Sequence, residues 1–248
     1  MDNPAGLSPT ALAHMRAVFL RRARQVYALY QMRCWLPIHV VLTRALSVAF
    51  YRGDRLLLPV YEPHDDRWME EDYIHELAHH VTGRDSTFFF KEGLAVYTVE
   101  ALLQREQRVP RAWPFFGTST ADWIAFYQRQ RIRLPLERAL TWPAFSNATA
   151  RQDFRSWQVY VTAGSFCAWY AARHSLSGIM RAFREERFRQ PVHELERAWL
   201  DALSSQGEGR FDPSLRFPHN RRYDRFVDFM VGARALGPGG SSRHPRSP

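Results

Sequence analysis

The run Ile74-His75-Glu76-Leu77-Ala78-His79-His80-Val81 predicts the central helix of this chain. Its apolar residues recur at helical spacing, which favours a packed helix over residues 68–81. Gly83 follows at the position where a left-handed helix cap belongs. Because side chains four residues apart lie on one face of a helix, about one turn apart, His75 and His79 are expected to point the same way.

Two histidines at this spacing can ligate one metal ion. Zinc takes histidine nitrogens and carboxylate oxygens in a tetrahedral arrangement, so His75 and His79 can share such an ion. Glu76 is rotated about 100° from His75 around the helix axis, where it can reach a water on the metal without ligating the ion. The pattern is short enough to arise by chance, so the assignment depends on a third ligand.

A second segment, Phe90-Lys91-Glu92-Gly93-Leu94-Ala95-Val96-Tyr97, offers that third ligand. Twelve residues separate His79 from Glu92, and Gly83 begins a turn that can bring a helix over residues 88–108 back against the first. Gly93 allows backbones to approach closely beside the ligand. The sequence therefore predicts one zinc ion per chain, held by His75, His79 and Glu92, with a fourth position left open.

The two segments together resemble the gluzincin zinc metallopeptidases, and in particular the peptidase MA-like group, where His-Glu-x-x-His is followed by a helix with Glu-Gly-Leu-Ala-x-Tyr. The resemblance covers residues 75–100, and residues 160–166 are similar to a later helix of that group. It implies a zincin-like fold and a peptidase that hydrolyses peptide bonds with a zinc-activated water. Glu76 would be the general base for that water.

The resemblance also implies a second donor for the tetrahedral oxyanion, placed on a later helix. Tyr160 lies in the similar segment, and a phenol stays protonated at neutral pH. The alternative is a tyrosine that simply packs among aromatic neighbours such as Trp157 and Phe166. His174 and Tyr127 are lesser candidates for the same role.

Two other residues compete for the metal. Asp85 lies ten residues after His75, where the metzincin peptidases place their third ligand, but that pattern requires glycine where this chain has Thr82. His80 points about 100° away from His79. We therefore expect Asp85 off the metal and His80 behind the site or on the surface.

Three features around the motif each have two interpretations. Glu100 and Asp72 lie at helical spacing from the ligands and could orient the histidines, although solvated positions are the simpler interpretation. The aromatic loop Trp113-Pro114-Phe115-Phe116-Gly117, together with Trp123, could line an apolar subsite. Clustered aromatic residues, however, more often belong to a hydrophobic core.

The chain is basic, with a formal net charge of +9. Such a balance could favour nucleic acid, an anionic membrane surface or acidic substrates. The arginines are scattered and no motif for DNA or RNA is visible, so we expect most of them on solvated faces. A nucleic-acid-binding protein and a non-catalytic zinc-containing interaction module stay as alternatives to a peptidase acting on peptide or protein substrates.

Cysteine usage and hydropathy predict a cytoplasmic protein. The 2 cysteines, Cys34 and Cys167, lie far apart and form neither a disulfide framework nor a cysteine-based zinc site. No signal peptide is visible, and the longest apolar stretch, residues 35–50, is too short to span a bilayer. We expect free thiols and no transmembrane segment.

The predicted fold is α+β and zincin-like, a single domain over residues 1–236 with a disordered tail over 237–248. An N-terminal lobe, about 1–108, holds a small sheet and the active-site helix; a mainly helical lobe follows, about 109–236. A narrow cleft or a specific substrate could restrain a peptidase of this kind, and a further hypothesis is that the first helix covers the cleft between the lobes. The other predicted elements are a helix over 9–33, strands over 38–42, 47–51 and 55–61, and helices near 120–132, 152–173, 176–189, 192–204 and 222–235.

Overall fold

The computed structural model describes residues 1–33, 38–44, 49–52, 55–60, 66–83, 87–112, 114–142, 154–185 and 187–204. Its elements are α1 (Pro9–Leu29), β1 (His39–Thr43), β2 (Phe50–Arg52), β3 (Arg55–Pro59), α2 (Asp66–Thr82), α3 (Phe88–Arg105), α4 (Thr120–Arg129), α5 (Leu136–Leu140), α6 (Phe154–Glu185) and α7 (Val192–Ser204). The predictions for Cys34, Asp85, Trp113, the helix over 222–235 and the tail lie outside the described residues. No helix in these ranges is both long and apolar enough to cross a bilayer.

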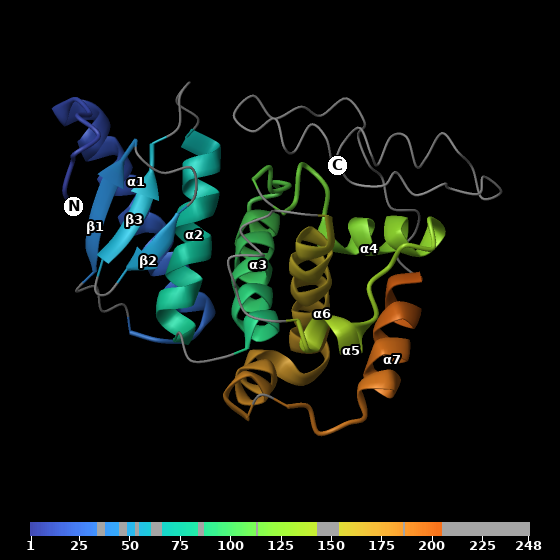
Figure 1. Ribbon diagram of the computed structural model, residues 1–248. Coiled ribbons are helices and arrows are strands. Elements are labelled where there is room, and N and C mark those ends of the chain that lie inside the picture. The colour runs from blue at the N-terminus through green and yellow to red at the C-terminus, as the bar shows by residue number, and fades with distance from the viewer. Residues whose placement is uncertain are drawn as a thin grey trace.

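A small sheet and its helices confirm the predicted α+β class. The strand order is β1-β3-β2, with β1 parallel to β3 and β2 antiparallel to it. The sheet and α1 lie on one side of α2, and helices α3 to α7 lie on the other (Figure 1). The central strand β3 buries Leu56 and Leu58 in the core.

Three helices end earlier than the sequence predicts, and the reason is the same in each. Gln31, Gln107 and Arg131 adopt positive φ angles of 56°, 55° and 58°. Each is followed by a residue whose N–H returns to the helix, as Met32 does to the Tyr27 carbonyl at 2.9 Å. These are left-handed caps made without glycine, so the sequence carries no glycine signal for them.

The predicted interruption between the helices near 152–173 and 176–189 is confirmed within α6. Ser175 has φ 68° and ψ 163°, far from helical values. The N–H of Gly178 donates to Ser175 Oγ at 3.4 Å, so the serine caps the second part of the helix. The short helix α5 was not predicted.

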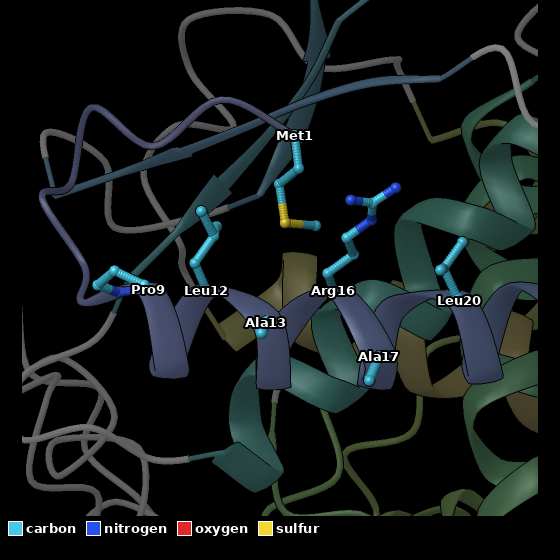
Figure 2. A pocket seen from close by; sticks show the side chains of 7 residues that line it. All are labelled: Met1, Pro9, Leu12, Ala13, Arg16, Ala17 and Leu20. Carbon is cyan, nitrogen blue, oxygen red and sulfur yellow. The ribbon is translucent and has the colours of Figure 1, made fainter.

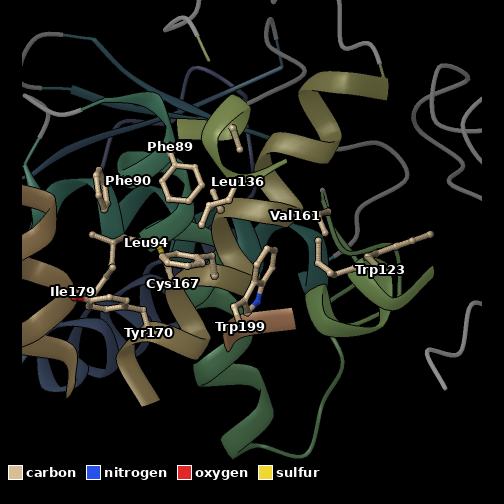
Figure 3. Packing of buried hydrophobic residues seen from close by; sticks show 14 of the residues in the cluster. Phe89, Phe90, Leu94, Trp123, Leu136, Val161, Cys167, Tyr170, Ile179 and Trp199 are labelled. Carbon is tan, nitrogen blue, oxygen red and sulfur yellow. The ribbon is translucent and has the colours of Figure 1, made fainter. Parts of the chain in front are cut away.

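Two hydrophobic clusters share α3. One contains the inner faces of α1, the sheet and α2; the other fills the space among α3 to α7 with residues such as Phe89, Leu94, Cys167 and Trp199 (Figure 3). On α3, Val96 belongs to the first cluster and Leu94 to the second. The helix that carries Glu92 is therefore held from both sides.

A buried ion cluster ties α1 to α2 and to the end of α3. Arg22 is 1% exposed, and its guanidinium donates to Glu70 Oε1 at 2.9 Å and to Glu106 Oε2 at 2.8 Å. Arg108 donates to the other Glu70 oxygen at 2.8 Å, and Arg21 also pairs with Glu70. Arg22 is thus an exception to the prediction that the arginines are solvated.

The two carboxylates of this cluster are held in their charged form. Burial alone would raise the pKa of Glu70, but hydrogen bonds and charges from Arg108, Arg22 and Arg21 lower it. The Arg22 hydrogen bond lowers the pKa of Glu106 to about 2. Because both values lie below the ordinary one, the resulting stabilisation is present above about pH 4.5 and is lost as the pH falls toward 2.

We expect Arg22→Ala to lower the free energy of unfolding by about 3–5 kcal/mol at pH 7, since it removes the buried cation that Glu70 and Glu106 share. Urea denaturation at pH 7 and pH 3 measures this, and the difference from the parent should narrow at pH 3. The control is Arg24→Ala, an exposed arginine of the same helix, with an expected change under about 0.5 kcal/mol. Equal changes in the two variants would contradict this role.

Candidate metal centre

Two consecutive helices build the centre. Chain reversal between α2 and α3 begins at Gly83, whose φ is +86° and whose N–H bonds to the His79 carbonyl at 3.1 Å. Glu92 lies just over one turn into α3, so it comes to lie beside the last turns of α2. The predicted chain reversal after Gly83 thus brings Glu92 back toward His79.

The three predicted ligands meet at one point. Nε2 of His75 lies 3.2 Å from Oε2 of Glu92 and 3.1 Å from Nε2 of His79. Nε2 of His79 lies 3.4 Å from the same Glu92 oxygen. Zinc bonds of 2.0–2.2 Å at tetrahedral angles place donor atoms about 3.3–3.5 Å apart. The triangle therefore fits one face of a zinc tetrahedron, and these residues can hold a metal ion.

The electrostatics of the centre favour a cation. Burial alone would lower the pKa of His75, but the hydrogen bond to Glu92 and the charges of Glu92, Glu76 and Asp72 raise it. The Glu92 side chain is 5% exposed, yet the two histidines hold the pKa of its carboxyl far below the usual range. A site that stabilises positive charge on an imidazole also stabilises a divalent metal between the same atoms.

Glu76 is buried on α2, next to His75 in the sequence. Its side chain is 6% exposed, and its charge contributes to the raised pKa of His75. Among the described residues it is not one of the three that converge on a metal position. A carboxylate near the ligands but outside their triangle is the arrangement that a general base requires.

His80 and α1 lie on a different side of α2 from the ligands. The His80 ring packs on Tyr27 of α1 at 6.3 Å, and Tyr73 packs on Phe19 at 5.6 Å. These α2 positions are about 130° around the helix from those of the two ligand histidines. The prediction that the first helix covers the cleft is therefore wrong, because α1 packs against another face of α2.

Glu100 does not orient the histidines. Its carboxylate accepts the Thr120 N–H at 2.9 Å and the Thr120 hydroxyl at 2.5 Å, which fixes the first turn of α4. It is also not simply solvated, since burial raises its pKa. Asp72 contributes to the field at His75, and Nδ1 of His79 is buried with no hydrogen-bond partner among the described residues.

Tyr160 lies close to the ligand end of α3. Its ring is 7% exposed and packs edge to face on Phe88, with centroids 5.3 Å apart. Phe88 is one turn before Glu92, so Tyr160 is near that turn of α3. Of the lesser candidates, Tyr127 packs on Trp157 at 6.0 Å, and His174 packs on Tyr170 at 4.4 Å.

Glycines allow α6 to approach this part of α3. A Cβ at Gly93 would lie 2.8 Å from the Cys167 sulfur and 2.9 Å from the Ala163 carbonyl oxygen. A Cβ at Gly164 would lie 2.2 Å from a Val96 methyl. The residue next to Glu92 is therefore in direct contact with α6, the helix that carries Tyr160.

The aromatic loop belongs to the core. Phe115 and Phe116 are almost fully buried, and the Trp123 indole donates to the Phe115 carbonyl at 2.7 Å. Trp157 likewise donates to the Pro114 carbonyl at 2.7 Å. Of the two interpretations of the loop, the hydrophobic core, which the sequence favours, is confirmed for its described part.

The sequence did not reveal the role of Glu71, one turn before His75. Its buried carboxylate accepts the N–H of Arg111 at 2.8 Å and of Ala112 at 2.5 Å, and burial raises its pKa to about 8. It thus fastens the start of the aromatic loop to the helix of the ligands. The only signal in the sequence was a charged residue, Glu71, at a position of the predicted helix that proves to be buried.

No protein-family model, curated protein or solved structure matches the chain. The features that mark the centre are those of this chain itself: the facing donor atoms, their burial and their charge.

We expect the purified chain to bind about one zinc ion, and His79→Ala and Glu92→Ala each to weaken binding by more than about 100-fold, since each removes a donor. Elemental analysis after dialysis against a competing chelator measures the zinc retained. The control is His80→Ala, which changes the adjacent histidine on another face of the helix and should retain zinc like the parent. Full zinc retention in both ligand variants would contradict the assignment.

Proposed function

We propose that this chain is a zinc metallopeptidase with a zincin-like fold of the gluzincin type. The observation that carries the proposal is the triangle formed by His75, His79 and Glu92, whose edges suit tetrahedral zinc. Glu76 supports the catalytic part, because a carboxylate beside the ligands and outside their triangle can act as a base. A zinc-containing module without activity would have no use for that carboxylate.

The chemistry follows from the residues around the metal position. Bound zinc would polarise a substrate carbonyl and lower the pKa of a water. Glu76 takes a proton from the attacking water and passes it to the departing amine. Tyr160 donates a hydrogen bond to the oxyanion that develops on the scissile carbonyl. The substrate class that this chemistry serves is peptides or proteins.

We expect Glu76→Gln to retain zinc and to lose at least about 100-fold in kcat, because the amide keeps the shape of the side chain and cannot accept the proton. Hydrolysis of a quenched-fluorescent peptide library, normalised to zinc content, measures this. Chelation should abolish activity in the parent, and added zinc should restore it. A Glu76→Gln enzyme as fast as the parent would sink the mechanism.

We expect Tyr160→Phe to lower kcat by about 10- to 1,000-fold with little change in KM or zinc content, since the lost donor acts in the transition state. Tyr127→Phe removes a hydroxyl from the buried cluster around Trp157 and serves as the matched control, with kcat near the parent's. If both variants lose activity equally, or neither does, Tyr160 has no special role.

A further inference from the structure

The outward side of α1 forms a hollow with the N-terminal residue. The hollow has a volume of about 410 Å³ and lies between Met1 and a line of α1 side chains (Figure 2). Leu12, Ala13, Ala17 and Leu20 form its α1 wall. Pro9 and Leu20 both line it, so it follows the helix for about 16 Å, or three turns. An elongated apolar recess of this length suits a helix better than a compact small molecule.

The charge that α1 presents beside the hollow is positive. Arg16 lines it, and Arg24 lies one turn beyond Leu20; both are exposed, and neither has an ion-pair partner among the described residues. Residues 9–29 contain no acidic residue. Two acidic residues of the described part of the chain already have partners: Asp2, which follows Met1 in the sequence, pairs with His39 at 2.6 Å, and Glu70 accepts from three arginines.

This face is separate from the metal centre. Helix α1 contacts α2 through Phe19 and Tyr27, against α2 positions that do not face the metal ligands. A molecule bound along Leu12 and Leu20 would therefore leave the metal position accessible. The surface can be occupied without blocking the chemistry.

We propose that the outward face of α1 is a docking surface for an acidic amphipathic helix of a partner protein. The apolar residues of the partner helix, spaced i, i+3, i+4 and i+7, would enter the hollow. There they would contact Leu12, Ala13, Ala17 and Leu20. Its carboxylates would pair with Arg16 and Arg24. Met1 and the α1 side chains line the hollow together, and such a hollow suits an inserted helix better than a flat lipid surface. Docking is a property of this face and does not depend on the proposed peptidase activity.

Fluorescence anisotropy of the full chain tests the docking. The probe is a labelled 14-residue peptide with leucines at helical spacing and glutamates on both flanks; a scrambled peptide of the same composition is the control probe. We expect the patterned peptide to bind at least about 10-fold more tightly than the scrambled one. Equal binding of the two peptides, or no binding of either, would overturn the proposal.

Two kinds of variant separate specific docking from general attraction to a basic protein. Arg16→Glu with Arg24→Glu should weaken patterned-peptide binding by at least about 10-fold, whereas Arg138→Glu with Arg197→Glu, the same charge change on α5 and α7, should alter it less than about 2-fold. Ala17→Phe fills the hollow without a charge change and should also weaken binding. Zinc content should stay at the parent level throughout.

The alternative occupant is tested on the same proteins. Vesicles of phosphatidylglycerol and phosphatidylcholine replace the peptide in a sedimentation assay. If vesicle binding depends on Arg16 and Arg24 while peptide binding does not, the face is a lipid surface and the proposal is overturned. Equal losses of peptide binding in both double variants would overturn it as well.

Discussion

The convergence of three donor atoms at the seam between α2 and α3 is the constraint on which the structure depends. Two imidazole nitrogens and a carboxylate oxygen, from His75, His79 and Glu92, lie within 3.4 Å of one another. Only one proton can lie between the two nitrogens, and a buried carboxylate needs a positive partner. A cation at the centre satisfies all three groups at once, and a tetrahedral metal does so with its ordinary bond lengths.

Much of the surrounding fold holds α2 and α3 in the positions that this convergence needs. From one side, Arg22 and its carboxylate partners tie α1 to the start of α2 and the end of α3. From the other, α6 approaches so closely that Gly93 has no room for a side chain. Glu71 and Glu100 fasten the segment that joins α3 to α4 onto the same helix pair. Carboxylates thus join neighbouring segments to α2 and α3 at several points around the centre.

Local patterns predicted that the three side chains meet, because the information that brings them together is local. His75 and His79 lie on one helix, and Glu92 follows after a single turn, so helical geometry and one chain reversal determine their meeting. Helix ends were less predictable, because Gln31, Gln107 and Arg131 take the left-handed conformation that usually signals glycine. The break at Ser175, by contrast, was predicted at its observed place.

Tertiary contacts decide the points that the sequence leaves open. Whether Phe115 and Trp123 line a subsite or a core depends on α6 and α4, which pack against them from distant parts of the sequence. The same holds for Glu100, whose partner Thr120 lies on another helix. The hypothesis that α1 covers the cleft is wrong for a similar reason. The apolar periodicity of α1 predicts that this helix packs on the protein, but it does not predict which side of α2 the helix contacts.

Zinc K-edge X-ray absorption of the zinc-loaded full chain tests the central claim most directly. We expect four light donors at about 2.0–2.1 Å, among them two imidazole rings, recognised by their multiple scattering, and one carboxylate oxygen. A six-coordinate shell of oxygens without imidazole scattering would contradict it, because zinc would then bind somewhere other than the seam between α2 and α3.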